Sequence, residues 1–157
     1  MHIAPFDNQN RAIVDINNSI VPLNYFNIVK LKRGESFDYR VPGYETCVVP
    51  ATGTVTVEVA GETYKDIGSR VVDVWDGEPE GVYVTSGART RVACVSATAE
   101  VFIAGARFDG EFPAFDVRKA DIDVVQYGSD DTKTHRKIKH ILGTKYRDRV
   151  GRLLVSE

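Results

Sequence analysis

Hydrophobic and polar residues alternate along most of the chain with a period of two. In the stretch TGTVTVEVAGE, Val55, Val57 and Val59 fall on one face, while threonine and glutamate side chains fall on the other. This pattern is typical of an antiparallel strand with one buried face. Six further stretches follow the pattern and are predicted as strands: residues 24–31, 44–50, 69–75, 81–86, 89–96 and 99–105.

Short turn signals separate these predicted strands. Glycine provides the positive φ that many tight turns require. No convincing helical stripe occurs before residue 115. Many short strands joined by such turns indicate an all-β sandwich or closed barrel. The turn signals are Lys32-Arg33-Gly34, Pro42-Gly43, Ala60-Gly61, Asp76-Gly77 and Ser86-Gly87.

The last forty residues have a less regular pattern. KADIDVVQYG, residues 119–128, predicts one helical turn that runs into a strand, with Asp116 as the helix cap. THRKIKHIL, residues 134–142, fits a helical turn and an alternating strand equally well. RLLVSE, residues 152–157, is apolar up to its last two residues. It either pairs as a strand at an edge or belongs to a chain that was once longer.

Length and composition favour one globular core. The chain has 157 residues, of which 43% are hydrophobic and 27% charged, and this is ordinary globular usage. Cys47 and Cys94 each lie inside an apolar run, so we expect buried free thiols rather than a disulfide. The N-terminal residues lack a secretion signal, and no apolar run approaches 18 residues. We therefore expect a cytoplasmic protein without a membrane partner.

The net charge of −2 is distributed unevenly. Residues 130–157 carry eight basic and four acidic side chains, whereas residues 1–129 carry 12 basic and 18 acidic ones. A basic segment can bind nucleic acid. The basic stretch from Thr134 to Arg152 contains one aromatic residue, Tyr146, and so lacks the stacking platform of single-strand binders. We do not expect a nucleic-acid partner.

The stretch GESFDYRVPGYETCVVPATG, from Gly34 to Gly53, has the outline of a metal-binding barrel motif. It resembles the first motif of cupin barrels, which runs from a glycine through a histidine pair and a glutamate to a second glycine. On that spacing the histidine pair falls on Arg40 and Pro42, and Glu45 lies close to the glutamate position.

The second cupin motif also lacks its histidine. Its proline-X-glycine step falls on Thr85-Ser86-Gly87, and its histidine position falls on Thr90. A divalent transition metal needs converging imidazole or thiolate donors, which an arginine, a proline and a threonine do not supply. We therefore predict no metal site in this barrel, and we expect Glu45 to be a surface or turn carboxylate.

Polar residues near these motifs are candidates for a small-ligand site. Barrel interiors can bind small molecules with apolar walls and a few polar groups. Strand alternation sends only some of the candidates inward. The candidate lining or rim residues are Arg40, Glu45, Tyr83, Arg89 and Arg91.

The three histidines do not form a pattern typical of catalysis. His2 lies at the terminus, where we expect it to be solvated. His135 and His140 are five residues apart, a spacing that places them on different faces of a helix or a strand. We favour solvated or hydrogen-bonded structural roles over acid–base chemistry.

Several stretches in fixed order resemble the 5-deoxy-glucuronate isomerases. They begin with LKRGESFDY, continue through residues 44–88 and ATAEVFIAGA, and end with THRKIKHIL leading to RLLVSE. The most specific features are the glycine-X-arginine step from Gly68 to Arg70, the apolar run ending at Trp75, and Pro79 before VYV.

The resemblance implies a bicupin architecture. Members of this family of inositol catabolism carry two barrels in one chain, and the second barrel holds a divalent metal on histidines. This sequence is similar to the first barrel and the linker, and RLLVSE looks like a strand whose continuation is missing. We therefore predict a cupin-like jelly-roll barrel without metal ligands over residues 1–115. Residues 116–157 are predicted to form a linker and either edge strands or the start of a second, absent barrel.

One polar residue follows from the resemblance as a substrate-binding candidate. Arg136 matches the arginine of a family segment that continues with histidine and asparagine, whereas this chain has Lys139 and His140 at those two positions. The guanidinium of Arg136 suits the carboxylate of a uronate. The alternative is a solvated or structural arginine.

Two functional hypotheses follow. In the first, the chain is the N-terminal, metal-free cupin half of a deoxyuronate aldose–ketose isomerase, with no cofactor of its own and a small sugar acid as partner. In the second, it is a non-catalytic cupin that senses a sugar or supports assembly. In both, unpaired strand edges favour a homo-oligomer.

Overall fold

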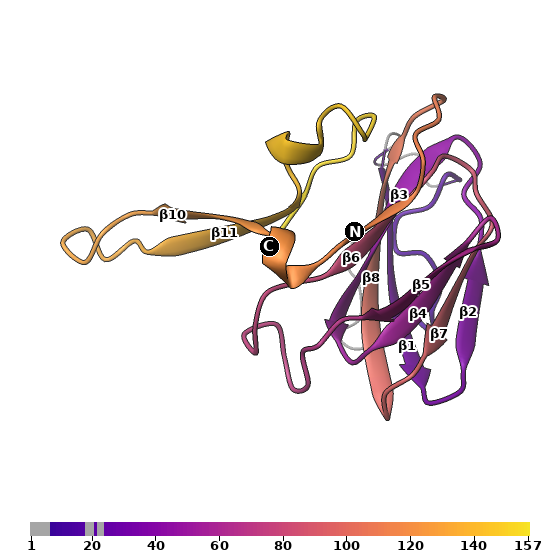
Figure 1. The fold of residues 1–157 in the computed structure, drawn as a ribbon, viewed down its shortest axis with the longest axis horizontal. Helices are drawn as coiled ribbons and strands as arrows, with labels where there is room; N and C mark the ends of the chain where they lie inside the picture. The colour runs from indigo at the N-terminus through magenta and orange to yellow at the C-terminus, as the bar shows by residue number, and fades with distance from the viewer. Residues whose placement is uncertain (1–6, 18–20, 22–23) are drawn as a thin grey trace.

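The computed structural model describes residues 7–17, 21 and 24–157. These residues form twelve β-strands and two single-turn 3₁₀ helices. Two antiparallel sheets face each other as a sandwich, and a long hairpin projects from one side (Figure 1). The predicted all-β sandwich is therefore confirmed.

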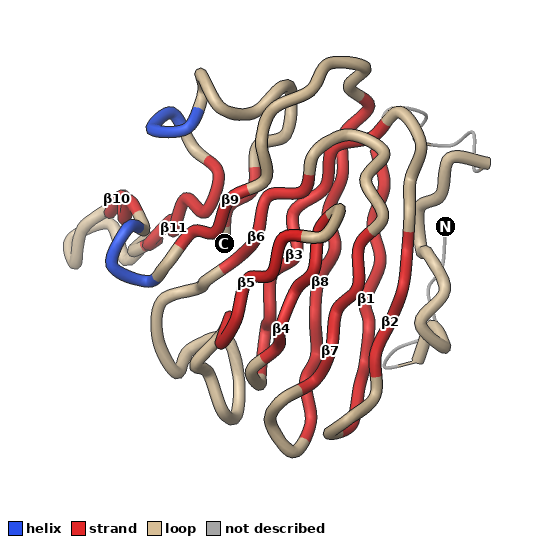
Figure 2. The backbone as a smooth tube through the Cα atoms, turned by 45° about the vertical axis from the view of Figure 1, so that its right-hand side comes forward, coloured by secondary structure: helices blue, strands red, loops and turns tan. Residues whose placement is uncertain are grey.

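The larger sheet has five strands in the order β1-β8-β3-β6-β9, and all neighbours are antiparallel (Figure 2). Its central strand β3 is buried along almost its whole length because it has neighbours on both sides and cover on both faces. The strands are β1 (Asn24–Lys32), β8 (Thr98–Arg107), β3 (Tyr44–Thr52), β6 (Gly81–Val84) and β9 (Phe115–Val117).

The smaller sheet has four antiparallel strands in the order β2-β7-β4-β5. In β4 the residues Val55, Val57 and Val59 are buried, as the alternation predicts, and Glu58 is exposed. The buried face packs against the larger sheet to form the main core. The strands are β2 (Ser36–Tyr39), β7 (Thr90–Cys94), β4 (Val55–Val59) and β5 (Glu62–Ile67).

The third sheet contains β10 (Asp123–Tyr127), β11 (Arg136–Leu142) and β12 (Val155–Ser156). It packs on the outer face of the larger sheet through the end of β11. The β10–β11 hairpin points away from the sandwich (Figures 1 and 2). A second hydrophobic cluster joins the outer side of β3, β6 and β9 to residues 141–153.

Most predicted strands are confirmed, but the one over residues 69–75 is wrong. That stretch is an irregular loop in which three apolar side chains are exposed: Val71 is 82%, Val72 76% and Trp75 87% accessible. The carboxylate of Asp76 accepts hydrogen bonds from the backbone N–H groups of residues 71, 72 and 73. Because the loop satisfies its donors internally, it does not join either sheet.

We expect this loop to loosen in acid. The hydrogen bond from Val72, with those from Asp73 and Val71 in support, holds the pKa of Asp76 below its ordinary value. A carboxyl group with a lowered pKa contributes order above its ordinary pKa, and this contribution is lost as the pH falls through the lowered value. The fluorescence anisotropy of Trp75, the single tryptophan, should therefore fall in acid. An Asp76→Asn variant should show low anisotropy already at neutral pH, and an unchanged neutral anisotropy would contradict this account.

The predictions for the last forty residues have mixed outcomes. Lys119–Asp121 forms one 3₁₀ turn ahead of β10, as predicted. Asp116 does not cap it, because the N-cap position is Arg118, and the Asp116 carboxylate accepts a hydrogen bond from the Arg118 guanidinium. The ambiguous stretch 134–142 resolves as the strand β11, and the final stretch provides the edge strand β12. The proposed division after residue 115 falls within β9 and stays a prediction.

Candidate functional site

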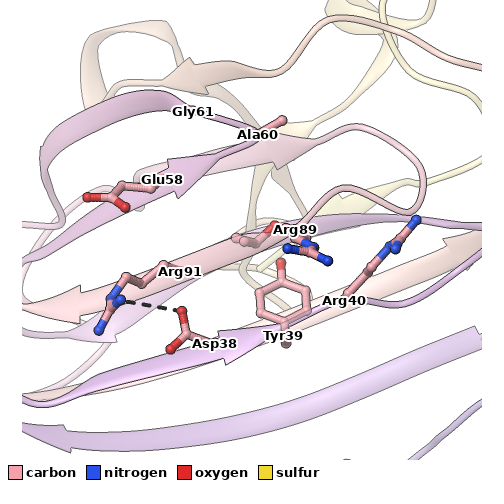
Figure 3. A pocket seen from close by; sticks show the side chains of 9 residues that line it. Asp38, Tyr39, Arg40, Glu58, Ala60, Gly61, Arg89 and Arg91 are labelled. Carbon is pink, nitrogen blue, oxygen red and sulfur yellow. Dashed lines mark ion pairs between the residues drawn. The ribbon is translucent and has the colours of Figure 1, made fainter.

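A pocket of about 690 Å³ lies at one end of the smaller sheet (Figure 3). Four of its lining residues are charged and exposed on or beside β2 and β7, and a fifth charge comes from β4. The lining residues are Asp38, Tyr39, Arg40, Glu58, Ala60, Gly61, Arg89, Thr90 and Arg91.

Strand register arranges the charges across the sheet. Arg91 of β7 lies opposite Asp38 of β2 on one side and opposite Glu58 of β4 on the other. The Arg91 Nε lies 3.8 Å from the Asp38 carboxylate, and its Nη2 donates to the Ser36 hydroxyl at 2.8 Å. These side chains are exposed or half-buried, so they form a polar row on the outer face of the sheet.

Two arginines form the other end of the pocket. The Arg89 backbone carbonyl accepts a hydrogen bond from Ala60 N–H, so Arg89 lies two residues beyond the Arg91 row along β7. The Arg40 Nε donates to the Gly87 carbonyl at 2.7 Å, which holds its guanidinium at the rim. Among the residues that the structure describes, the Arg89 guanidinium has no hydrogen-bond or ion-pair partner. In Figure 3 both arginines lie beside Tyr39, away from Glu58.

Hydroxyl groups occupy the barrel interior behind this pocket. The Tyr39 hydroxyl is 2.8 Å from the Thr46 hydroxyl, and Thr90 beside them is buried. Burial raises the pKa of Tyr39 well above its ordinary value, so the phenol stays neutral. Arg40 at the rim of the pocket and Thr90 in the barrel interior thus occupy two of the three positions where cupin histidines are expected.

The donor chemistry here does not fit a divalent transition metal. No group of three His, Cys, Asp or Glu side chains that could hold such an ion occurs within the described part of the chain. An arginine, a phenol and threonine hydroxyls are poor substitutes for imidazole and thiolate. What the pocket offers instead is a set of hydrogen-bond donors and positive charge beside two carboxylates.

A family model for the KduI/IolB family matches residues 2–157. The chain belongs to this family. Two relatives are 5-deoxy-glucuronate isomerases. The one from Listeria monocytogenes serotype 4b (strain CLIP80459) is 25% identical over 133 residues, covering 83% of this chain and 48% of the relative. The one from Lacticaseibacillus casei is 28% identical over 106 residues, covering 66% and 38%. The chain spans about half the length, or less, of these curated relatives.

A solved structure shows the same fold. An IolB-like protein from Salmonella typhimurium LT2 has a TM-score of 0.70 and 23% identity, and the match covers 76% of this chain and 44% of that one. The fold of this KduI/IolB-family chain is all-β and cupin-like, as predicted from its motifs. Within the described residues, no helix is long and apolar enough to cross a membrane.

The structure separates the five polar candidates into two groups. Arg40, Arg89 and Arg91 line the pocket. Glu45 and Tyr83 lie elsewhere, on the outer side of β3 and β6, where the Tyr83 hydroxyl donates to the Glu45 carboxylate at 2.8 Å. The two groups are separated because the arginines lie on or beside strands of the smaller sheet, whereas Glu45 and Tyr83 lie on strands of the larger sheet.

The expectation that Glu45 is a surface or turn carboxylate is wrong. Glu45 has no exposed surface, since residues 141–153 cover this side of β3. Its carboxylate accepts hydrogen bonds from the backbone N–H groups of Gly151, Arg152 and Leu153 and from the Tyr83 hydroxyl. In this KduI/IolB-family barrel the carboxylate of the first motif anchors the C-terminal segment.

Arg136 lies far from the pocket in sequence and is not among its lining residues. It is exposed on the β10–β11 hairpin, with its guanidinium carbon 5.9 Å from the centre of the Tyr127 ring. Its role as a carboxylate ligand stays a prediction.

The two described histidines have separate partners. His135 is hydrogen-bonded to Gln126 and Asp130, while His140 Nδ1 is 2.7 Å from the Ser156 hydroxyl. His2 lies outside the described residues.

Sequence analysis missed the carboxylates of the pocket. Asp38 and Glu58 were not singled out, although the alternation of β2 and β4 places both on the exposed face. Arg70 belongs to the glycine-X-arginine step, but its burial was not predicted: it is 2% accessible and forms a two-pronged ion pair with the Glu157 side chain. Nothing in the sequence signals that pair, because its members are 87 positions apart.

Proposed function

We propose that this chain serves in the aldose–ketose isomerisation of a deoxyuronate, 5-deoxy-glucuronate in inositol catabolism, as a cupin barrel without a metal centre of its own. The observation that carries the proposal is the family match over residues 2–157, together with two relatives that are 5-deoxy-glucuronate isomerases. The proposal includes a cytoplasmic location and self-association through exposed strand edges.

The isomerisation is assigned to a metal centre, and this barrel has no histidines at the positions expected for metal ligands. An aldose–ketose isomerisation moves a proton from C2 to C1 and another from the C2 hydroxyl to the C1 oxygen, so that the formula is unchanged. The positions expected for metal-binding histidines hold Arg40, Pro42 and Thr90. We therefore assign the metal-dependent chemistry to a second, histidine-bearing barrel, in the same polypeptide or in another chain.

The contribution of this barrel is then structural support. Glu45, the carboxylate near the glutamate position of the first motif, accepts four hydrogen bonds, and three of them hold residues 151–153 against the sandwich. A carboxylate with that many donors and no exposed surface is fixed in position and is not in contact with solvent.

Turnover of 5-deoxy-glucuronate tests the proposal. The chain alone, supplied with Mn²⁺ or Zn²⁺, should show no conversion above the buffer blank. A hybrid in which it replaces the matching half of the Listeria monocytogenes isomerase should convert the sugar. Turnover by the chain alone, one tightly bound transition metal per chain, or a folded but inactive hybrid would contradict the proposal. Circular dichroism establishes whether the hybrid is folded.

A further inference from the structure

We propose that the pocket formed by β2, β7 and β4 binds a sugar acid of the uronate or aldonate class, at a site separate from the isomerisation chemistry. The inference rests on the two ends of the pocket, which differ in charge. It does not depend on the proposed function, because binding here requires neither a metal nor turnover.

The positive end suits a carboxylate. Arg40 and Arg89 line the same end, and the Arg89 guanidinium has no partner among the described residues. Arginine presents planar, paired N–H donors that match the two oxygens of a carboxylate. The bond from Arg40 to the Gly87 carbonyl restrains one of these groups before a ligand arrives.

The opposite end suits hydroxyl groups. Asp38 and Glu58 are acceptors on either side of Arg91. Sugar hydroxyls donate to carboxylates and accept from guanidinium groups, so this row can bind a polyol. The rows of Arg89 and Arg91 are two residues apart, about 7 Å along the strand. That separation is comparable to the length of a six-carbon sugar acid.

The charge balance selects among anions. The pocket contains three arginines and two carboxylates, a formal excess of one positive charge. This balance complements a monoanion with a neutral, hydroxylated tail. The carboxylates of Asp38 and Glu58 repel a polyanion such as a nucleic acid, whose phosphates would lie along the whole groove.

Titration calorimetry at low ionic strength tests the proposal, using D-glucuronate and D-gluconate as probes and D-glucose and inorganic phosphate as comparisons. We expect the two sugar acids to bind, and glucose and phosphate to bind at least about tenfold more weakly. Equal binding of glucose would show that no carboxylate is recognised. Equal binding of phosphate would show a general anion site. Either result, or no binding of the sugar acids, overturns the proposal.

Matched arginine variants locate the site. Arg89→Gln should weaken glucuronate binding by about tenfold or more, because it removes a charged donor without disturbing a native contact. Arg147→Gln is the control, because Arg147 is exposed and outside the pocket, and it should leave binding unchanged. Loss of binding in Arg136→Gln with retention in Arg89→Gln would place the carboxylate on the β10–β11 hairpin and overturn the assignment.

Discussion

Replacing Glu45 with alanine should destabilise the protein by about 3–5 kcal/mol in urea unfolding. The substitution leaves the N–H groups of residues 151–153 and the Tyr83 hydroxyl without their acceptor, a carboxylate that has no exposed surface. Each stranded donor costs about 1–3 kcal/mol, and relief from burying a carboxylate offsets part of the total. The same variant should speed amide hydrogen exchange at residues 151–153 more than in β4.

Tyr83→Phe is the matched control for Glu45→Ala. It removes one of the four donors and keeps the ring packed against Phe115, so we expect a loss of about 1 kcal/mol. Burial, with the hydrogen bond to Glu45 in support, raises the pKa of Tyr83 far above its ordinary value, so the phenol remains a donor at neutral pH. Equal losses for the two variants would contradict the anchoring role of the carboxylate.

Gly53→Ala should destabilise the protein by about 3–5 kcal/mol, measured by the same unfolding experiment. Gly53 has φ of +81°, and an added Cβ would overlap the Thr98 carbonyl oxygen and lie 2.8 Å from the Ala99 Cα. Backbone strain and steric overlap therefore act together, and the overlapping atoms belong to the backbone of β8, which cannot move aside easily.

A substitution at Gly34 separates the effect of backbone strain from the effect of steric overlap. Its φ is also +81°, but an added Cβ would meet nothing within 4 Å. Gly34→Ala should therefore cost only the strain, about 1–2 kcal/mol. A Gly53→Ala variant no less stable than Gly34→Ala would contradict this account. It would show that the backbone of β8 moves away from residue 53 without a cost in stability.

These two glycines illustrate how much of the fold could be predicted from sequence. The sequence predicts a turn at Gly34 and marks Gly53 only as the closing glycine of the motif, and both residues adopt positive φ. The sequence does not reveal that only Gly53 lies against another strand. Likewise, residues 69–75 are rich in valine and predict a strand, yet Asp76 closes that segment into a loop.

The candidate site was predictable in part. Arg40, Arg89 and Arg91 were identified near the cupin motifs, and all three line the pocket. Asp38 and Glu58 are distant in sequence from Arg89 and Arg91, so only the pairing of β2 and β4 with β7 brings these charges together.

The order of residues alone determined the alternating strands, the all-β fold class and the absence of histidine at the cupin ligand positions, because these are local or compositional properties. Tertiary structure alone decided that Glu45 is an anchor rather than a surface carboxylate, and that the residues at 69–75 stay outside the sheets. Both outcomes depend on contacts between distant segments. The sequence specifies the chemical type of each side chain. Its burial and its hydrogen-bond partners depend on which strands pack against it.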